Sequence, residues 1–194
     1  MKAVSEQQNT QGNELALVDA PDRNNYSFGA PKSLTYNEVE AASWSLACEL
    51  FDAGIRRGDV ALVQLPNIAE HVVADIALKM LGATVEPIEM YCTGEVLGKI
   101  AGSHAVKAYI STTDYKGESF TCTHQAAFPD GTLIFAFGDE EPESAQLIGE
   151  TSADIEALDS CQAYINKQIG GSKEATDCAA FPIDLAHQHF SSTG

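Results

Sequence analysis

The segment GIRRGDVALVQLPN, residues 54–67, indicates the architecture of this chain most directly. A polar turn at residues 56–59 leads into an almost continuously apolar run at residues 60–65, and Pro66 ends that run. Uninterrupted apolar runs of this length are typical of strands that are covered on both faces, as in a parallel sheet. We therefore expect a buried strand here, with helices on either side of it.

Helical spacing of apolar residues is present both before and after this strand. Upstream, Asn37 is expected to cap a helix that Gly54 ends. Downstream, Asn67 and Glu70 have the spacing of a capping box, and apolar residues recur at helical intervals from there to Gly82.

The remaining pattern alternates strands with helices. Strands are predicted at residues 34–36, 83–87, 106–111 and 132–137 and around Leu185, and further helices begin at Thr93 and Ser152. Residues 112–130 have no clear assignment. Alternation of this kind predicts βαβ units, so we expect an α/β fold with a mostly parallel sheet flanked by helices. The polar, turn-rich residues 1–32 are expected to form a loosely attached lead-in.

Charge excludes some classes of partner. The 194 residues contain 28 Asp and Glu but only 11 Lys and Arg, which gives a formal net charge of −17. Nucleic-acid binding depends on surplus basic side chains that displace phosphate counterions, so a generic nucleic-acid binder is excluded. An anionic membrane surface is excluded for the same reason. The 44% of hydrophobic residues is sufficient for an ordinary core.

The polar amino-terminal residues and the scattered cysteines favour a cytoplasmic protein. The first fourteen residues are polar, and no apolar run approaches the roughly 20 residues that span a bilayer. The five cysteines are scattered without a CxxC pair, so we interpret them as reduced thiols.

Three segments carry a family resemblance. They are SLTYNEV (residues 33–39) together with residues 54–67, ALKMLGATVEPI (77–88), and DLA followed by FSSTG (184–194). This set resembles the amino-terminal part of the adenylate-forming enzymes, which include acyl- and aryl-CoA synthetases, aryl-AMP ligases such as 2,3-dihydroxybenzoate-AMP ligase, and firefly luciferase. The resemblance implies that residues 33–194 form the first α/β subdomain of an AMP-binding domain, and that the sequence stops within its phosphate loop.

The resemblance also implies a two-step ligase reaction. A carboxylate attacks the α-phosphate of Mg-ATP to give an acyl- or aryl-adenylate and pyrophosphate. Coenzyme A or the pantetheine thiol of a carrier protein then takes the acyl group. Hydroxyls and backbone N–H groups of a Ser/Thr/Gly loop suit the charge that develops on pyrophosphate.

Four residues are the implied phosphate-binding site: Ser191 and Ser192 first, then Thr193 and Gly194. With the register set by Asp184, the family usually has a glycine where Thr193 stands and a hydroxyl residue at the next position, so the loop is either a variant or carries one extra residue before a complete motif. An ordinary polar turn after a strand is the alternative interpretation of the same four residues.

The family's loop lysine, adenine-stacking aromatic motif, ribose-binding acid and carboxyl-terminal domain would all follow Gly194. We therefore expect this chain to be inactive without the remainder of the enzyme. Two alternatives stay open: a non-catalytic module that binds a nucleotide or a partner, and one half of a split enzyme.

Three further patterns bear on the chemistry. DYKG at residues 114–117 is similar to an element of the aryl-AMP ligases, which favours small aryl acids over fatty acids as substrates. His187 and His189 share one face of a predicted strand, but no third metal ligand is indicated by spacing, so no metal site is predicted. A triad of Asp184, His187 and Ser191 has no support beyond proximity in the sequence.

Overall fold

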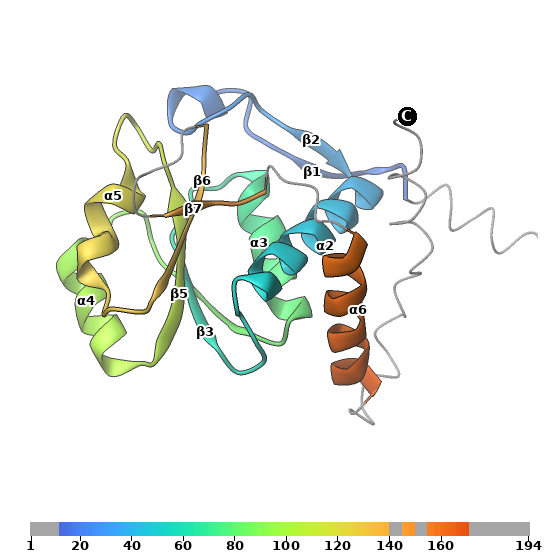
Figure 1. Cartoon of the computed structure of the whole chain (residues 1–194). Coiled ribbons are helices and arrows are strands. Elements are labelled where there is room, and N and C mark those ends of the chain that lie inside the picture. Colours follow the sequence, from blue (N-terminus) through green and yellow to red (C-terminus); the bar gives the residue numbers. More distant parts are fainter. Residues whose placement is uncertain (1–11, 140–144, 150–154, 171–194) are drawn as a thin grey trace, which may run out of the picture.

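The computed structural model describes residues 12–139, 145–149 and 155–170. Among them, a five-stranded sheet has the order β4-β3-β5-β6-β7 (Figure 1). Every adjacent pair is parallel. The strands are β3 (Val60–Val63), β4 (Thr84–Pro87), β5 (Val106–Thr112), β6 (Leu133–Phe137) and β7 (Gln146–Leu147). The predicted α/β fold with a parallel sheet is confirmed.

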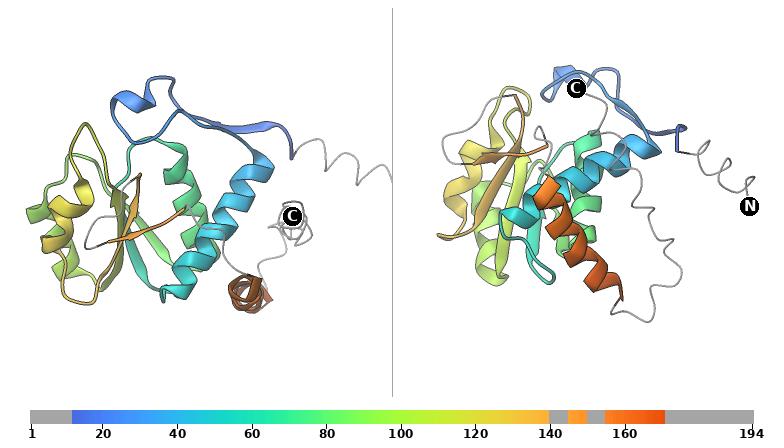
Figure 2. Two further views of the ribbon diagram at one scale, coloured as in Figure 1. Left: turned by 45° about the horizontal axis from the view of Figure 1, so that its top comes forward. Right: turned by 45° about the vertical axis from the view of Figure 1, so that its right-hand side comes forward.

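Helices cover both faces of the sheet, as the two further views show (Figure 2). On one face lie α2 (Tyr36–Asp52) and α3 (Ala69–Met80), and α6 (Ile155–Gly170) packs against α2. On the other face lie α4 (Gly94–Ser103), α5 (Phe120–His124) and the short 3₁₀ helix η2 (Gln125–Ala127).

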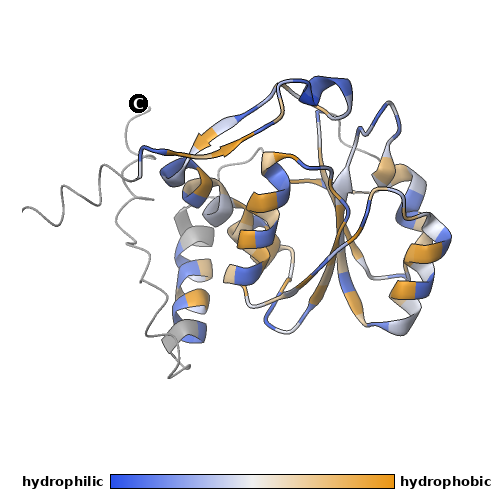
Figure 3. Cartoon of the chain, turned by 180° about the vertical axis from the view of Figure 1, so that it is seen from behind, coloured by the Kyte–Doolittle hydropathy of each residue, from blue (hydrophilic) through white to orange (hydrophobic). Residues whose placement is uncertain are grey.

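Each layer has its own apolar core. The larger core includes Leu46, Val63 and Ile110, and the smaller one includes Leu62 and Leu97. Neighbouring residues of β3 enter opposite cores because side chains alternate along a strand. Seen from behind, the apolar positions of the helices accordingly face the sheet (Figure 3).

The start of α2 differs from the prediction. Thr35, not Asn37, is the N-cap: its hydroxyl accepts the Glu38 N–H, and the Glu38 carboxylate accepts the Thr35 N–H. Because Thr35 and Glu38 form a complete capping box, Asn37 lies inside the helix. The predicted end is confirmed, since α2 stops at Asp52 and Gly54 follows with φ 104°.

The start of α3 also differs. Asn67 and Glu70 form no capping box, and the N-cap residue is Ile68, whose side chain cannot cap. Asp19 Oδ1 instead accepts the Ala69 N–H at 2.8 Å. A carboxylate from a distant part of the chain thus satisfies the first turn of this helix.

The prediction of a loosely attached lead-in is wrong for residues 12–32. β1 (Leu15–Val18) pairs antiparallel with β2 (Ser33–Thr35), and the 3₁₀ helix η1 (Arg23–Asn25) follows β1. Arg23 is fully buried. In Figure 1 this segment crosses one end of the α/β core, and the buried ion pairs of Arg23 with Asp19 and Glu70 attach it there.

Two regions lacked a complete prediction. Residues 112–130 contain α5, with Ser119 as its N-cap, and η2. The two-residue strand β7 was not predicted. The strand expected around Leu185 lies outside the described residues.

Candidate functional site

The candidate site lies at the edge of the sheet where the parallel strands end. In α/β sheets, ligands bind in crevices outside the carboxyl ends of the strands. Two hollows border this edge. One follows β3 and β4, and the other follows β6 and β7.

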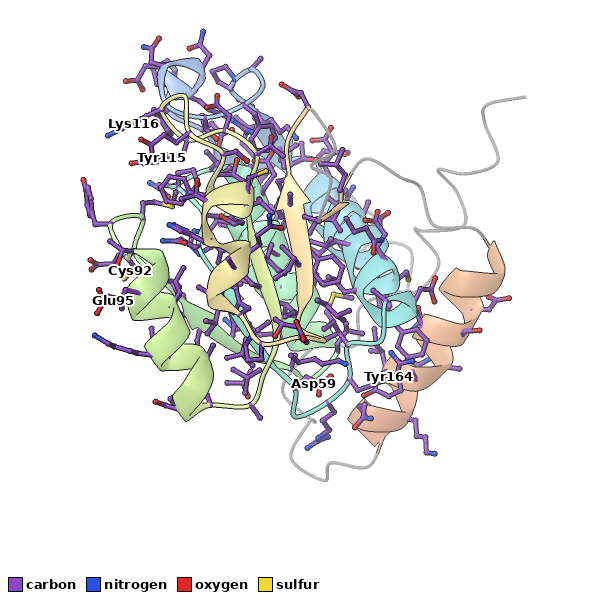
Figure 4. All side chains as sticks on the ribbon, turned by 60° about the vertical axis from the view of Figure 1, so that its left-hand side comes forward. Asp59, Cys92, Glu95, Tyr115, Lys116 and Tyr164 are labelled. Carbon is purple, nitrogen blue, oxygen red and sulfur yellow. The ribbon has the colours of Figure 1, made fainter. Side chains whose placement is uncertain are left out.

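The first, which we call the aromatic hollow, has a volume of about 760 Å³. Its walls include Tyr26, Pro66, His71, Ile88, Tyr91 and Tyr115. Tyr115 belongs to the DYKG segment, where Asp114 Oδ1 accepts the Gly117 N–H and fixes the turn. Figure 4 shows Tyr115 and Lys116 at the end of the molecule opposite Asp59 and Tyr164. The combination of rings with a few polar groups suits a planar, partly apolar ligand.

The second, the ionic hollow, has a volume of about 260 Å³. Its lining includes Arg23, Phe28, Lys32, Glu70, Phe137 and Gly138. It lies between the amino-terminal segment, the first turn of α3 and the end of β6.

Arg23 organises the wall of the ionic hollow. Its Nη1 donates to Asp19 Oδ2 at 2.6 Å, its Nη2 donates to Glu70 Oε1 at 2.8 Å, and its Nε donates to the Phe28 carbonyl at 3.1 Å. Burial alone would lower the pKa of Arg23, but the hydrogen bonds and charges of Glu70 and Asp19 raise it above its ordinary value. The guanidinium therefore stays charged although it has no exposed surface.

Lys32 adds a second cation to the same carboxylate, with its Nζ 2.7 Å from Glu70 Oε1. Within the part of the chain that the structure describes, the other carboxylate oxygen, Oε2, is buried without a hydrogen-bond partner. Arg23 and Lys32 therefore contact the same oxygen of Glu70, Oε1.

A buried polar cluster supports the loop between β4 and α4. Gln64, directly after β3, donates from Nε2 to the carbonyls of Glu89 and Cys92 at 2.9 and 3.1 Å. Its Oε1 accepts from the Tyr109 hydroxyl at 2.6 Å and lies 3.1 Å from His124 Nδ1. Burial lowers the pKa of His124, which favours the neutral ring. The cluster fixes one wall of the aromatic hollow, since Glu89 lines it.

The predicted phosphate-binding residues Ser191, Ser192, Thr193 and Gly194 lie outside the described residues, so their roles stay predictions. The same holds for Asp184, His187 and His189. Within the described ranges, no group of three or more His, Cys, Asp or Glu side chains could hold a metal ion.

Sequence reasoning missed both hollows. The available signal was the βαβ alternation itself, because it places the loops after β3, β4, β5 and β6 at one edge. For Asp19 and Arg23 no sequence signal exists, since they lie in a polar segment without periodicity. Among the described helices, none is long and apolar enough to cross a membrane.

Comparison with known proteins identifies the family of this chain. Residues 4–182 match the family described as "AMP-binding enzyme". The chain belongs to this family. The match covers most of the chain, including the strand edge and both hollows, so the resemblance found in the sequence motifs is confirmed.

Individual members of the AMP-binding family show the extent of the similarity. The chain is 31% identical over 120 residues to surfactin synthase subunit 2 of Bacillus subtilis (strain 168), covering 62% of this chain and 3% of that protein. It is 33% identical over 112 residues to 4-coumarate–CoA ligase 3 of Arabidopsis thaliana, covering 54% of this chain and 20% of that protein. The chain thus spans a fifth or less of these relatives.

A solved structure agrees with the fold. The anthranilate CoA ligase AuaEII, in complex with anthranoyl-AMP, superposes with a TM-score of 0.59 at 16% identity. The superposition covers 84% of this chain and 27% of that one. At this level of identity the likeness concerns the architecture.

Proposed function

We propose that this chain is the amino-terminal part of an ATP-dependent ligase that joins a carboxylic acid to AMP and then to a thiol. The observation that carries the proposal is the match to AMP-binding enzymes over residues 4–182. In the first step the acid carboxylate attacks the α-phosphate of Mg-ATP, which gives an acyl- or aryl-adenylate and releases pyrophosphate. In the second step the thiol attacks the adenylate carbonyl and releases AMP.

The phosphate groups of ATP are assigned to Ser191 and Ser192, with Thr193 and Gly194 beside them. Hydroxyl and backbone donors of such a loop stabilise the negative charge that grows on the leaving pyrophosphate. No residue of this chain is assigned to magnesium, which we propose arrives bound to ATP. The groups that would hold adenine and ribose are assigned to the remainder of the enzyme, so the chain alone is expected to be inactive.

A small aryl acid is the proposed substrate class. Tyr115 of the DYKG segment lies in the wall of the aromatic hollow, which Tyr26 and Tyr91 also line. The similar 4-coumarate–CoA ligase is named for an aromatic acid. The thiol acceptor is proposed to be coenzyme A or a carrier pantetheine. A cytoplasmic location is proposed from the scattered thiols.

Acid-dependent exchange of labelled pyrophosphate into ATP tests the proposal. The complete enzyme is expected to catalyse exchange with at least one aryl acid from a panel of aryl and fatty acids, and this chain alone is expected to give none. A Ser191→Ala/Ser192→Ala variant of the complete enzyme should lose about 100-fold or more in exchange rate, as expected for lost oxyanion-type donors. A complete, folded protein that gives no exchange with any acid would contradict the ligase proposal and favour a non-catalytic module.

A further inference from the structure

Two thiols from different helices meet in the larger core. Cys48 lies on α2 and Cys161 on α6, and neither has any exposed surface. The two thiols interact, and this interaction is the largest influence on the pKa of each. Both belong to the same buried cluster, in the region where α2 and α6 pack against each other.

The contacts around the pair hold α6 in register against α2. The Tyr164 hydroxyl accepts the Arg57 N–H at 2.7 Å, and Arg57 Nη1 donates to Gln168 Oε1 at 3.0 Å. The Tyr164 ring lies 5.0 Å from the Phe51 ring. These contacts lie on the face of α6 that carries Cys161, one turn or more further along the helix.

The helix α6 is also peripheral. It packs against α2 and crosses it at the outside of the molecule (Figure 2). Peripheral helices open locally at a lower free energy than the core strands do. A small oxidant can therefore reach the thiols during an opening of α6, after which reclosure brings them back together.

We propose that Cys48 and Cys161 form a disulfide when the protein is exposed to hydrogen peroxide, which joins α6 covalently to α2. One of the two thiols attacks one peroxide oxygen as the thiolate, the O–O bond breaks, and the products are a sulfenic acid and, after protonation, water. The sulfur of the other cysteine then attacks the sulfenic sulfur, the S–O bond breaks, and the hydroxyl leaves as a second water. The two thiols lose two electrons and two protons in total, and one peroxide is reduced to two waters.

Either thiol of the pair can react first. Their interaction raises the pKa of Cys48 and lowers that of Cys161. Because the two thiols titrate as a pair, the nucleophilic thiolate belongs to the pair and not to one residue.

The other described cysteines provide matched comparisons. Cys122 is exposed and Cys92 is partly exposed, so both meet the oxidant more readily. Neither has a hydrogen bond with another thiol among the described residues. Oxidation at these two positions should therefore give products without an intramolecular crosslink.

The test uses the full chain with Cys92, Cys122 and Cys178 replaced by Ser, so that the pair alone remains. After peroxide treatment we expect both thiols to disappear together in a monomer, and dithiothreitol to restore both. Peptide mapping should identify one crosslinked peptide that contains both residues. Variants that also carry Cys48→Ser or Cys161→Ser should retain circular dichroism and give no intramolecular crosslink.

Two results would overturn the proposal. One is persistence of both thiols at a peroxide dose that fully oxidises Cys122 in the unsubstituted chain. The other is oxidation of either cysteine of the pair to sulfinic acid with its partner still a thiol. Limited proteolysis gives an independent readout: the crosslinked chain should resist cleavage within α6 more than the reduced chain, whereas equal cleavage would argue against a clamp on that helix.

Discussion

Arg23 Nη2 lies 2.8 Å from Glu70 Oε1, although 47 residues separate the two in the chain. Neither side chain has more than a tenth of its surface exposed, and Asp19 completes the network from the other side of the guanidinium. Asp19 also accepts the first N–H of α3 through its other oxygen. The network therefore joins the amino-terminal segment to the helix that begins at the strand edge.

Replacement of Arg23 by Met is expected to destabilise the fold by about 3–5 kcal/mol, because it leaves the carboxylate of Asp19 buried without a cation and that of Glu70 with only the half-exposed Lys32. Urea unfolding of the variant and the unsubstituted chain measures this difference. Lys79→Met is the matched control, since Lys79 forms an exposed pair with Asp75 at 2.6 Å and should change stability by less than about 1 kcal/mol. Equal effects of the two substitutions would show that the network does not anchor the segment.

These residues also show where prediction from sequence succeeds and where it stops. Local patterns placed the helices and strands because hydrophobic periodicity and helix-ending glycines such as Gly54 act over a few residues. Glu70 matched a capping box by spacing, but tertiary contacts recruited it to Arg23 and left the helix cap to Asp19. No local rule encodes a bond between residues 47 positions apart.

The candidate functional site was likewise predictable from the sequence only in part. The parallel topology followed from alternation, and with it the edge where ligands bind. The hollows themselves depend on which side chains converge there. Tyr26 enters one wall because residues 12–32 fold over the sheet, and the polar composition of that segment did not reveal this.

Glu49 should make stability depend on pH. Burial raises the pKa of Glu49, while the hydrogen bond from the Gly149 N–H partly opposes the rise. For a carboxyl whose pKa is higher in the folded state, the stabilising contribution is complete below the ordinary pKa and is lost as the pH rises through the folded pKa. Glu49→Gln should therefore stabilise the fold near pH 7 by less than about 1 kcal/mol, and the gain should vanish near pH 4.

Thermal unfolding of this variant across that pH range provides the measurement. Glu95→Gln is a suitable control because Glu95 is exposed and pairs with Lys99 at 2.7 Å. The Glu95→Gln variant should show no gain in stability near pH 7. A Glu49→Gln variant that is less stable than the unsubstituted chain near pH 7 would contradict the argument from burial.

His124 is expected to have the opposite effect on pH dependence. Burial lowers its pKa, although the charge of Glu118 acts against the shift. A histidine with a lower pKa in the folded state contributes stability that is present above its ordinary pKa and is lost as the pH falls through the folded value. Unfolding between about pH 7 and pH 5 should therefore show a loss of stability that His124→Gln reduces. The exposed His104, changed to Gln, should leave the slope as it is.

The docking of α6 offers a prediction that is independent of any oxidation. Tyr164→Phe removes the acceptor of the Arg57 N–H but keeps the ring contact with Phe51, so we expect a loss of about 0.5–1.5 kcal/mol. Because α6 packs against α2 at the outside, the change should appear first as faster amide hydrogen exchange in α6, with strands β3 and β5 unaffected. Tyr91→Phe, at a side chain that is 83% exposed, should alter neither readout. If Tyr164→Phe left exchange in α6 unchanged, the hydrogen bond from the Arg57 N–H to Tyr164 would not be what holds this helix, and the position of α6 would rest on apolar packing and the Arg57–Gln168 hydrogen bond.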